Sequence, residues 1–206
     1  MKQQIWVIHG GNAFERYEDY LTALKAKSDI TLERLRSSDW KMSLEACLGN
    51  EFEVYAPHMP NKQNAKYLEW KIYFEKLIPL MNAEVVLVGH SLGGIFLAKY
   101  LSEELFPKKI LGTLLVAAPF NTPTNHPLAD FVLGDRFTLF AQQAGKILLY
   151  QSEDDVVVPY SNVNEYQRVL PQAILRRFLD RGHFNGSTFP EIVEDIRMLS
   201  TNTSHH

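Results

Sequence analysis

Short apolar runs recur along this chain and alternate with longer amphipathic stretches. The apolar runs occupy six ranges: 5–9, 52–56, 84–88, 110–117, 146–151 and 173–179. Each has the length of a β-strand, and continuous hydrophobicity is typical of strands that are covered on both faces. The alternation predicts an α/β protein with a mostly parallel sheet of about six strands and helices on both faces.

Several of the intervening stretches carry helical patterns. Residues 64–81 and residues 93–105 place apolar side chains at helical spacing, so each is expected to cover the sheet with one face. The last helix is predicted to begin near Thr188, because Pro190 then falls in its first turn and Glu191 at the capping-box position.

Two segments do not fit this simple alternation. Residues 28–50 are polar and helix-prone, and their expected anchors in the core are Leu35, Trp40, Leu44 and Leu48. Residues 118–145 contain three prolines followed by an apolar group. Loops of this length are often functional, so 118–145 is predicted either to form a small cap or to add a helix to the core. The whole chain, 1–206, is expected to form one domain.

Composition and charge narrow the class of protein. The 206 residues are 46% hydrophobic and 22% charged, which is ordinary for a soluble globular protein. With a net charge of −3 and only isolated basic pairs, neither nucleic acid nor an anionic membrane surface is an expected partner. No apolar stretch approaches the roughly 20 residues of a membrane span. Nothing in the sequence indicates a protein partner.

The cysteine and histidine residues of the sequence predict neither a disulfide nor a metal site. The single cysteine, Cys47, excludes an intrachain disulfide and is expected to be a small packed hydrophobe in a reducing compartment. No targeting segment is visible, so a cytoplasmic location is expected. The terminal histidines His205 and His206 are not counted as candidate metal ligands. The other histidines lack the spacing of zinc ligands, and no metal or organic cofactor is expected.

The most specific motif follows the third apolar run. The stretch Gly89-His90-Ser91-Leu92-Gly93 lies between that run and an apolar helical pattern. A G-x-S-x-G between a strand and a helix is typical of a nucleophile elbow, a strained turn that raises the serine hydroxyl above the sheet. The two outer glycines leave room where the strand and the helix nearly touch. Ser91 is therefore the predicted nucleophile.

A serine hydroxyl needs a general base, and the base needs a third group to orient it. In the scaffold that carries such an elbow, the acid and then the histidine follow the serine along the chain, each at a strand end. The fifth apolar run leads into consecutive acidic residues, of which Asp155 is favoured by the Asp-Val-Val-Val-Pro spelling and Asp154 is the alternative. The sixth run leads into His183, which is the predicted base.

An oxyanion hole is also required, because negative charge develops on the substrate oxygen. The backbone N–H of Leu92, directly after the nucleophile, is one expected donor. The second is expected from the turn after the first strand, where Gly11 is the first candidate and Asn12 the second.

The turn His9-Gly10-Gly11, the elbow at 89–93, Asp155 and His183 together resemble the motif set of the α/β-hydrolase fold. The short length and the Pro57-His58-Met59-Pro60 turn, followed by Trp70 on a helix, are similar to the small serine hydrolases related to retinoblastoma-binding protein 9. The resemblance covers most of the chain. It implies a three-layer fold without the first two strands of the larger hydrolases, and it assigns the triad to Ser91, Asp155 and His183.

The motifs and the resemblance predict a serine hydrolase that acts through an acyl-enzyme. A carboxylesterase on small or medium acyl esters is the favoured activity, with a small-molecule ester as its substrate. The alternatives are an acyltransferase, thioesterase, peptidase or lyase with the same triad, and a hydrolase-like binding protein without activity. Nucleotide binding is discounted, because the glycine-rich turns lack the lysine of a phosphate loop and do not spell G-x-G-x-x-G.

Overall fold

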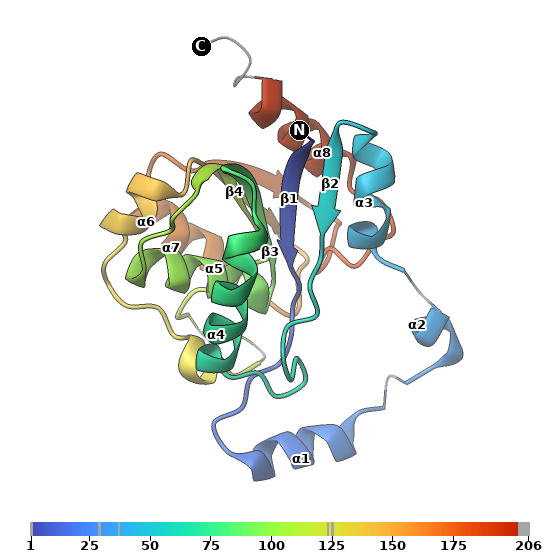
Figure 1. Cartoon of the computed structure of the whole chain (residues 1–206). Coiled ribbons are helices and arrows are strands. Elements are labelled where there is room, and N and C mark those ends of the chain that lie inside the picture. The colour runs from blue at the N-terminus through green and yellow to red at the C-terminus, as the bar shows by residue number, and fades with distance from the viewer. Residues whose placement is uncertain (1, 29, 37, 123, 125, 202–206) are drawn as a thin grey trace.

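The computed structural model describes residues 2–28, 30–36, 38–122, 124 and 126–201, so the terminal histidine pair lies outside it. At its centre is a six-stranded sheet (Figure 1). The strands are β1 (Gln3–Ile8), β2 (Phe52–Tyr55), β3 (Glu84–His90), β4 (Lys109–Val116), β5 (Lys146–Ser152) and β6 (Ile174–Phe178). All six apolar runs of the sequence therefore form strands, with small differences at their ends.

The order of the strands explains where a ligand site belongs. The sheet has the order β2-β1-β3-β4-β5-β6, and every pairing in it is parallel. The chain steps outward from β1 to β2, crosses back to β3, and then proceeds to the opposite edge. In open α/β sheets, ligands bind beside the carboxyl ends of the strands at the point where the winding reverses. Here that point lies between β1 and β3.

Helices connect most of the strands. They are α1 (Tyr17–Ala26), α2 (Leu32–Arg36), α3 (Trp40–Leu48), α4 (Tyr67–Leu77), α5 (Leu92–Glu103), α6 (Thr138–Gln143), α7 (Ser161–Val169) and α8 (Pro190–Thr201). The stretch predicted as one helix, 64–81, is α4 followed by a 3₁₀ turn, Ile78–Leu80. Pro79 accounts for the change, because it lacks the N–H that would continue the α-helix. Among the described residues, no helix is long and apolar enough to cross a membrane.

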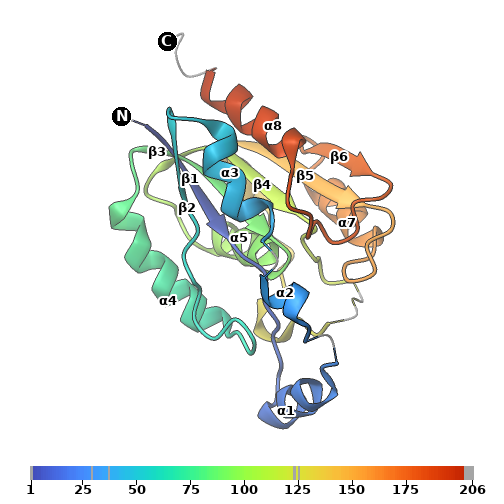
Figure 2. The ribbon, with the colours of Figure 1, turned by 90° about the vertical axis from the view of Figure 1, so that its right-hand side faces the viewer.

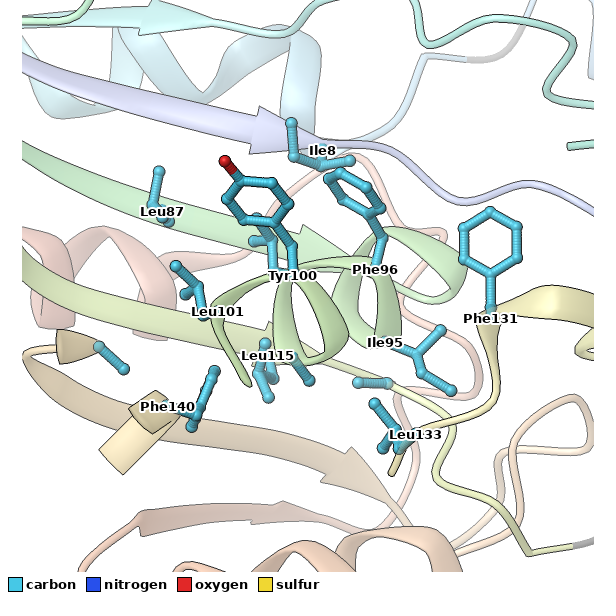
Figure 3. Packing of buried hydrophobic residues seen from close by; sticks show 14 of the residues in the cluster. Ile8, Leu87, Ile95, Phe96, Tyr100, Leu101, Leu115, Phe131, Leu133 and Phe140 are labelled. Atoms are coloured by element: carbon cyan, nitrogen blue, oxygen red, sulfur yellow. The ribbon is translucent and has the colours of Figure 1, made fainter. Parts of the chain in front are cut away.

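The helices cover both faces of the sheet, which confirms the predicted three-layer architecture (Figures 1 and 2). On one face, α4 to α7 enclose the larger hydrophobic cluster. Figure 3 shows the part of this cluster around α5, where the helix meets β1, β3 and β4 through Ile95, Phe96, Tyr100, Leu101, Ile8, Leu87 and Leu115. On the other face, α3 and α8 enclose the smaller cluster.

The 28–50 segment is only partly anchored. Trp40, Leu44 and Leu48 of α3 are buried against the sheet, as expected. Leu35 is 73% exposed, so its expected role as an anchor is wrong. Leu35 belongs to α2, which together with α1 projects away from the sheet (Figures 1 and 2). We call residues 15–36, which carry these two helices, the arm. Cys47 is likewise exposed rather than packed, because Leu44 and Leu48 take the inward positions of α3.

The 118–145 segment contributes strongly to the core. Its large buried apolar side chains are Phe120, Phe131, Leu133, Phe137 and Phe140. All of them belong to the larger cluster, and Phe140 lies on α6. The second half of the segment therefore completes the core on the α5 face.

Candidate active site

Ser91 lies in the sharp turn between β3 and α5, with φ 54° and ψ −123°. A positive φ is uncommon for a residue other than glycine and is held in place by its surroundings. Those surroundings require glycine on both sides. A Cβ at Gly93 would lie 2.2 Å from the carbonyl oxygen of Ile8, and one at Gly89 would lie 2.5 Å from the carbonyl oxygen of Gly93. The turn is thus as tight as the sequence motif predicts.

The structure brings the three predicted side chains together. The Oγ of Ser91 is 2.9 Å from the Nε2 of His183, and the Nδ1 of this ring is 2.9 Å from the Oδ2 of Asp155. Asp155 follows β5 and His183 follows β6, so all three side chains lie beyond the carboxyl ends of strands. An ionised carboxylate only accepts hydrogen bonds, so a neutral ring carries its proton on Nδ1 and leaves Nε2 to accept from the hydroxyl.

Asp155 is fixed by several further contacts. Its Oδ1 accepts the backbone N–H groups of Val157 and Val158 at 2.8 and 3.0 Å, and Gln151 donates to its Oδ2 at 3.3 Å. The Asp155 side chain has no exposed surface. These donors stabilise the carboxylate and hold its second oxygen toward the histidine ring.

Asp154, the alternative acid, has a different task. Its Oδ1 accepts from the hydroxyl of Ser152 at 2.5 Å and from the backbone N–H of Gly182 at 2.9 Å. These two hydrogen bonds lower the pKa of the Asp154 carboxyl. They tie the loop after β5 to the loop after β6, and the structure does not bring Asp154 to the His183 ring.

The turn after β1 lies beside the serine. A Cβ at Gly10 would be 3.5 Å from the Oγ of Ser91, and a Cβ at Gly11 would be 3.3 Å from the side chain of Leu92. The predicted donors Leu92 and Gly11 are therefore neighbours. The backbone N–H of Asn12 is already donated to the carbonyl of Lys62 at 2.8 Å. This bond leaves Gly11 as the better placed of the two candidates in the turn.

His9 braces this turn, a role that the sequence did not indicate. Its Nε2 accepts the backbone N–H of Met59 at 2.9 Å, and its Nδ1 lies 2.6 Å from the carbonyl oxygen of Gly10. Nδ1 therefore donates and the ring is neutral. Burial lowers the pKa of His9, and the nearby ammonium groups of Lys62 and Lys41 add to this effect. The contact joins positions 50 residues apart, for which no local pattern exists.

His90 holds the backbone of His183 in place. Its Nε2 donates to the carbonyl oxygen of His183 at 2.9 Å, and its Nδ1 lies 3.4 Å from the Nζ of Lys41. Lys41 in turn forms an ion pair with Asp39 at 2.5 Å. Burial holds the pKa of His90 well below its ordinary value. The sequence places His90 beside the nucleophile but gives no sign of its contact with His183.

A cavity of about 440 Å³ is lined by Ser91 and His183. Its other walls come from several parts of the chain, including the 28–50 and 118–145 segments. Lysine side chains reach it from the first part of the chain, and apolar side chains from the segment after β4; among these are Lys27, Lys41, Lys62, Pro119, Pro127 and Leu128. Among the described residues, no group of three or more His, Cys, Asp or Glu side chains could hold a metal ion.

The sequence of this chain is similar to those of known serine hydrolases. The family model described as serine hydrolase matches residues 33–195. The chain belongs to this family. A serine hydrolase of Rattus norvegicus, RBBP9, is 23% identical over 153 residues, which cover 73% of this chain and 79% of that protein.

Solved structures of similar shape include hydrolases. The ydeN gene product of B. subtilis superposes with a TM-score of 0.76 at 19% identity, over 97% of this chain and 100% of that one. A 2-hydroxy-6-oxo-6-phenylhexa-2,4-dienoate hydrolase from Rhodococcus reaches 0.63 at 14% identity, over 98% and 91%. At these identities the likeness concerns the α/β-hydrolase fold. The match to the family begins at residue 33, so α1 lies outside it.

Proposed function

We propose that this serine hydrolase is a carboxylesterase that cleaves small or medium acyl esters through an acyl-enzyme on Ser91. The observation that carries the proposal is the unbroken hydrogen-bonded series from Ser91 Oγ through both nitrogens of His183 to Asp155, with both distances 2.9 Å. The serine end of this series lines the 440 Å³ cavity, while the aspartate end is fully buried.

The reaction follows from the donors and acceptors in this series. The Oγ of Ser91 attacks the carbonyl carbon of the ester while its proton moves to the Nε2 of His183. The bond to the alcohol then breaks, and the proton passes from Nε2 to the departing oxygen. A water molecule, deprotonated by the same nitrogen, then attacks the acyl carbon. The bond to Ser91 breaks, its Oγ takes the proton back from Nε2, and the acid is released. Asp155 stabilises the imidazolium that forms in each half of the reaction.

Negative charge on the carbonyl oxygen needs donors that are already in place. The N–H of Leu92, at the start of α5, and the N–H of Gly11 are assigned this role. A helix N-terminus carries partial positive charge, so the position of Leu92 favours an anion. The His9 contacts hold the turn that carries Gly11.

The size and lining of the cavity support small or medium esters. Cavities for small ligands commonly measure roughly 300–1,000 Å³, and this one falls at the lower end. We assign the first part of the 118–145 segment, including Pro119 and Leu128, as a small cap that contacts an apolar part of the substrate.

Hydrolysis of p-nitrophenyl esters tests the proposal. The wild-type protein should hydrolyse the acetate and butanoate esters, and Ser91→Ala should lower kcat by roughly 10⁴-fold or more, because the nucleophile is lost. Ser102→Ala is the matched control, since its hydroxyl only bonds the Ala98 carbonyl within α5. It should retain the wild-type rate.

The same assay distinguishes the alternatives. The p-nitroanilide of butanoic acid should react much more slowly than the ester. A faster reaction of the anilide would favour a peptidase, and equal ester hydrolysis by wild type and Ser91→Ala would overturn the proposal.

A further inference from the structure

The cavity carries more positive than negative charge. Three lysines line it, Lys27, Lys41 and Lys62. Among the described lining residues, Asp39 is the one carboxylate. An ester with an uncharged chain on each side of the carbonyl would form no ion pair with these lysines. The excess of positive charge is better matched by an anionic substrate.

Asp39 is committed to Lys41. One oxygen of its carboxylate is 2.5 Å from the Nζ of Lys41, and the other accepts the backbone N–H of the same residue at 3.0 Å, where Asp39 caps α3. The Lys41 side chain is only 12% exposed, and its Nζ also approaches His90. This pair is therefore part of the scaffold behind His183, and its two charges offset each other.

Lys62 stands in a different position. Lys62 is exposed and lines the cavity, and its positive charge is close enough to His9 and Lys41 to contribute to lowering the pKa of both. In the part of the chain that the structure describes, no carboxylate lies within ion-pair distance of its ammonium group. Its backbone is nevertheless fixed, because its carbonyl accepts the N–H of Asn12 and lies 2.6 Å from the place of a Cβ on Gly11. The backbone that carries this cation is thereby held against the turn that flanks Ser91.

We infer that Lys62 binds a carboxylate on the substrate, so that the preferred esters are anionic and carry this group a few bonds from the scissile carbonyl. The inference rests on the proposed esterase function and names the substrate class for it. The apolar remainder of such an ester would lie against Pro119 and Leu128, on the lining supplied by the other segment.

Two matched esters test the inference. Wild-type protein is assayed with the p-nitrophenyl monoester of adipic acid and with p-nitrophenyl 6-methylheptanoate, in which an isopropyl group replaces the carboxylate at nearly equal size. We expect kcat/KM to favour the anionic ester by about two- to fivefold at low salt, the range of one exposed charge pair. The preference should shrink as the ionic strength rises.

Three lysine variants locate the effect. Lys62→Met should abolish the ratio between the two esters, and Lys62→Arg should retain it, because the positive charge remains. Lys146→Met is the matched control, since Lys146 is an exposed lysine at the amino end of β5, whereas the site lies at the carboxyl ends of the strands. It should leave the ratio unchanged. A wild-type ratio of one for both this pair of esters and the pair with an anionic alcohol part, or a ratio that survives Lys62→Met, would overturn the inference.

The side of the ester that carries the charge is tested with the butanoate ester of 4-hydroxybenzoate, in which the alcohol part is anionic. A Lys62-dependent preference for either anionic ester over its neutral counterpart supports the inference. Binding of methyl hydrogen adipate to Ser91→Ala, measured by calorimetry with and without Lys62→Met, separates the two proposals. Lys62-dependent binding without any turnover would contradict the esterase alone, whereas turnover without Lys62 dependence would contradict the inference alone.

Discussion

Two helices leave the sheet beside the cavity, and they differ sharply in burial. Helix α5 follows β3 through Ser91 and buries nine of its twelve residues. Helix α1 follows β1 and buries none of its ten. Figure 3 shows α5 enclosed by side chains from the strands and from the 118–145 segment, whereas Figures 1 and 2 show α1 projecting away from the body.

The core holds one side of the site in place, and the other side is formed by an exposed part of the chain. On the elbow side, which comprises β3, Ser91 and α5, the position of the nucleophile is set by the buried strand and helix that flank it. The arm contributes Lys27 to the cavity lining, but its helices carry exposed apolar side chains, among them Tyr17 and Leu24. The elbow side is thus built for a fixed geometry, and changes there should have much larger effects than changes on the arm.

The largest effect on kcat is expected for Asp155, the acid that orients His183 toward Ser91. Asp155→Asn should lower kcat on p-nitrophenyl butanoate by about 10⁴-fold, because an amide no longer favours the Nδ1–H tautomer of His183. Asp154→Asn removes a carboxylate that only ties two loops together, and it should change kcat by less than about tenfold. The reverse order of the two variants would show that the acid is misassigned.

A matched pair of leucines compares the two helices directly. Leu101 of α5 is fully buried, and Leu24 of α1 is 49% exposed. Leu101→Ala should lower the free energy of unfolding by about 3 kcal/mol, because it leaves a cavity in the core. Leu24→Ala should change it by less than about 0.5 kcal/mol. Urea unfolding measures both, and equal losses would mean that α1 packs against the body in solution.

A smaller difference should appear as a pH dependence of stability. Burial depresses the pKa of His90 in the folded protein, so below about pH 6.5 the unfolded chain takes up a proton that the folded chain does not. The unfolding free energy should therefore fall as the pH drops below about 6.5, by up to about 1.4 kcal/mol per pH unit for this group.

The variant His90→Gln isolates this contribution. Glutamine retains a donor for the His183 carbonyl and an acceptor for Lys41 but does not titrate. Its unfolding free energy should fall less steeply than that of the wild type between pH 6.5 and 5.5, while His9, whose pKa is also lowered, contributes equally to both. Identical slopes would contradict the assignment of a neutral, buried His90.

Much of the fold and of the candidate site was predictable because the signals are local. Each strand is a continuous apolar run, and the glycines on both sides of Ser91 are fixed by the close approach of strand and helix. Chain order then placed an acid and a histidine at later strand ends. The choice of Asp155 over Asp154 depended on the spelling of one loop, and the structure brings Asp155 to His183.

The rest depends on contacts between distant positions. His90 meets Lys41 across 49 positions, and His9 meets Met59 across 50. Nothing in the local sequence of either partner indicates these pairings. The failure of Leu35 as an anchor has the same cause, since a helical pattern shows which face is apolar but not whether the helix reaches the core.

The central claim is that Ser91 is an activated nucleophile, and reaction with a fluorophosphonate probe tests it most directly. The intact mass of the folded wild-type protein should increase by one adduct, and peptide mapping should place this adduct on Ser91. Ser91→Ala should gain no adduct, and His183→Asn should react far more slowly, because the hydroxyl loses its base. A folded wild-type protein that gains no adduct, or that carries it on another residue, would contradict the account.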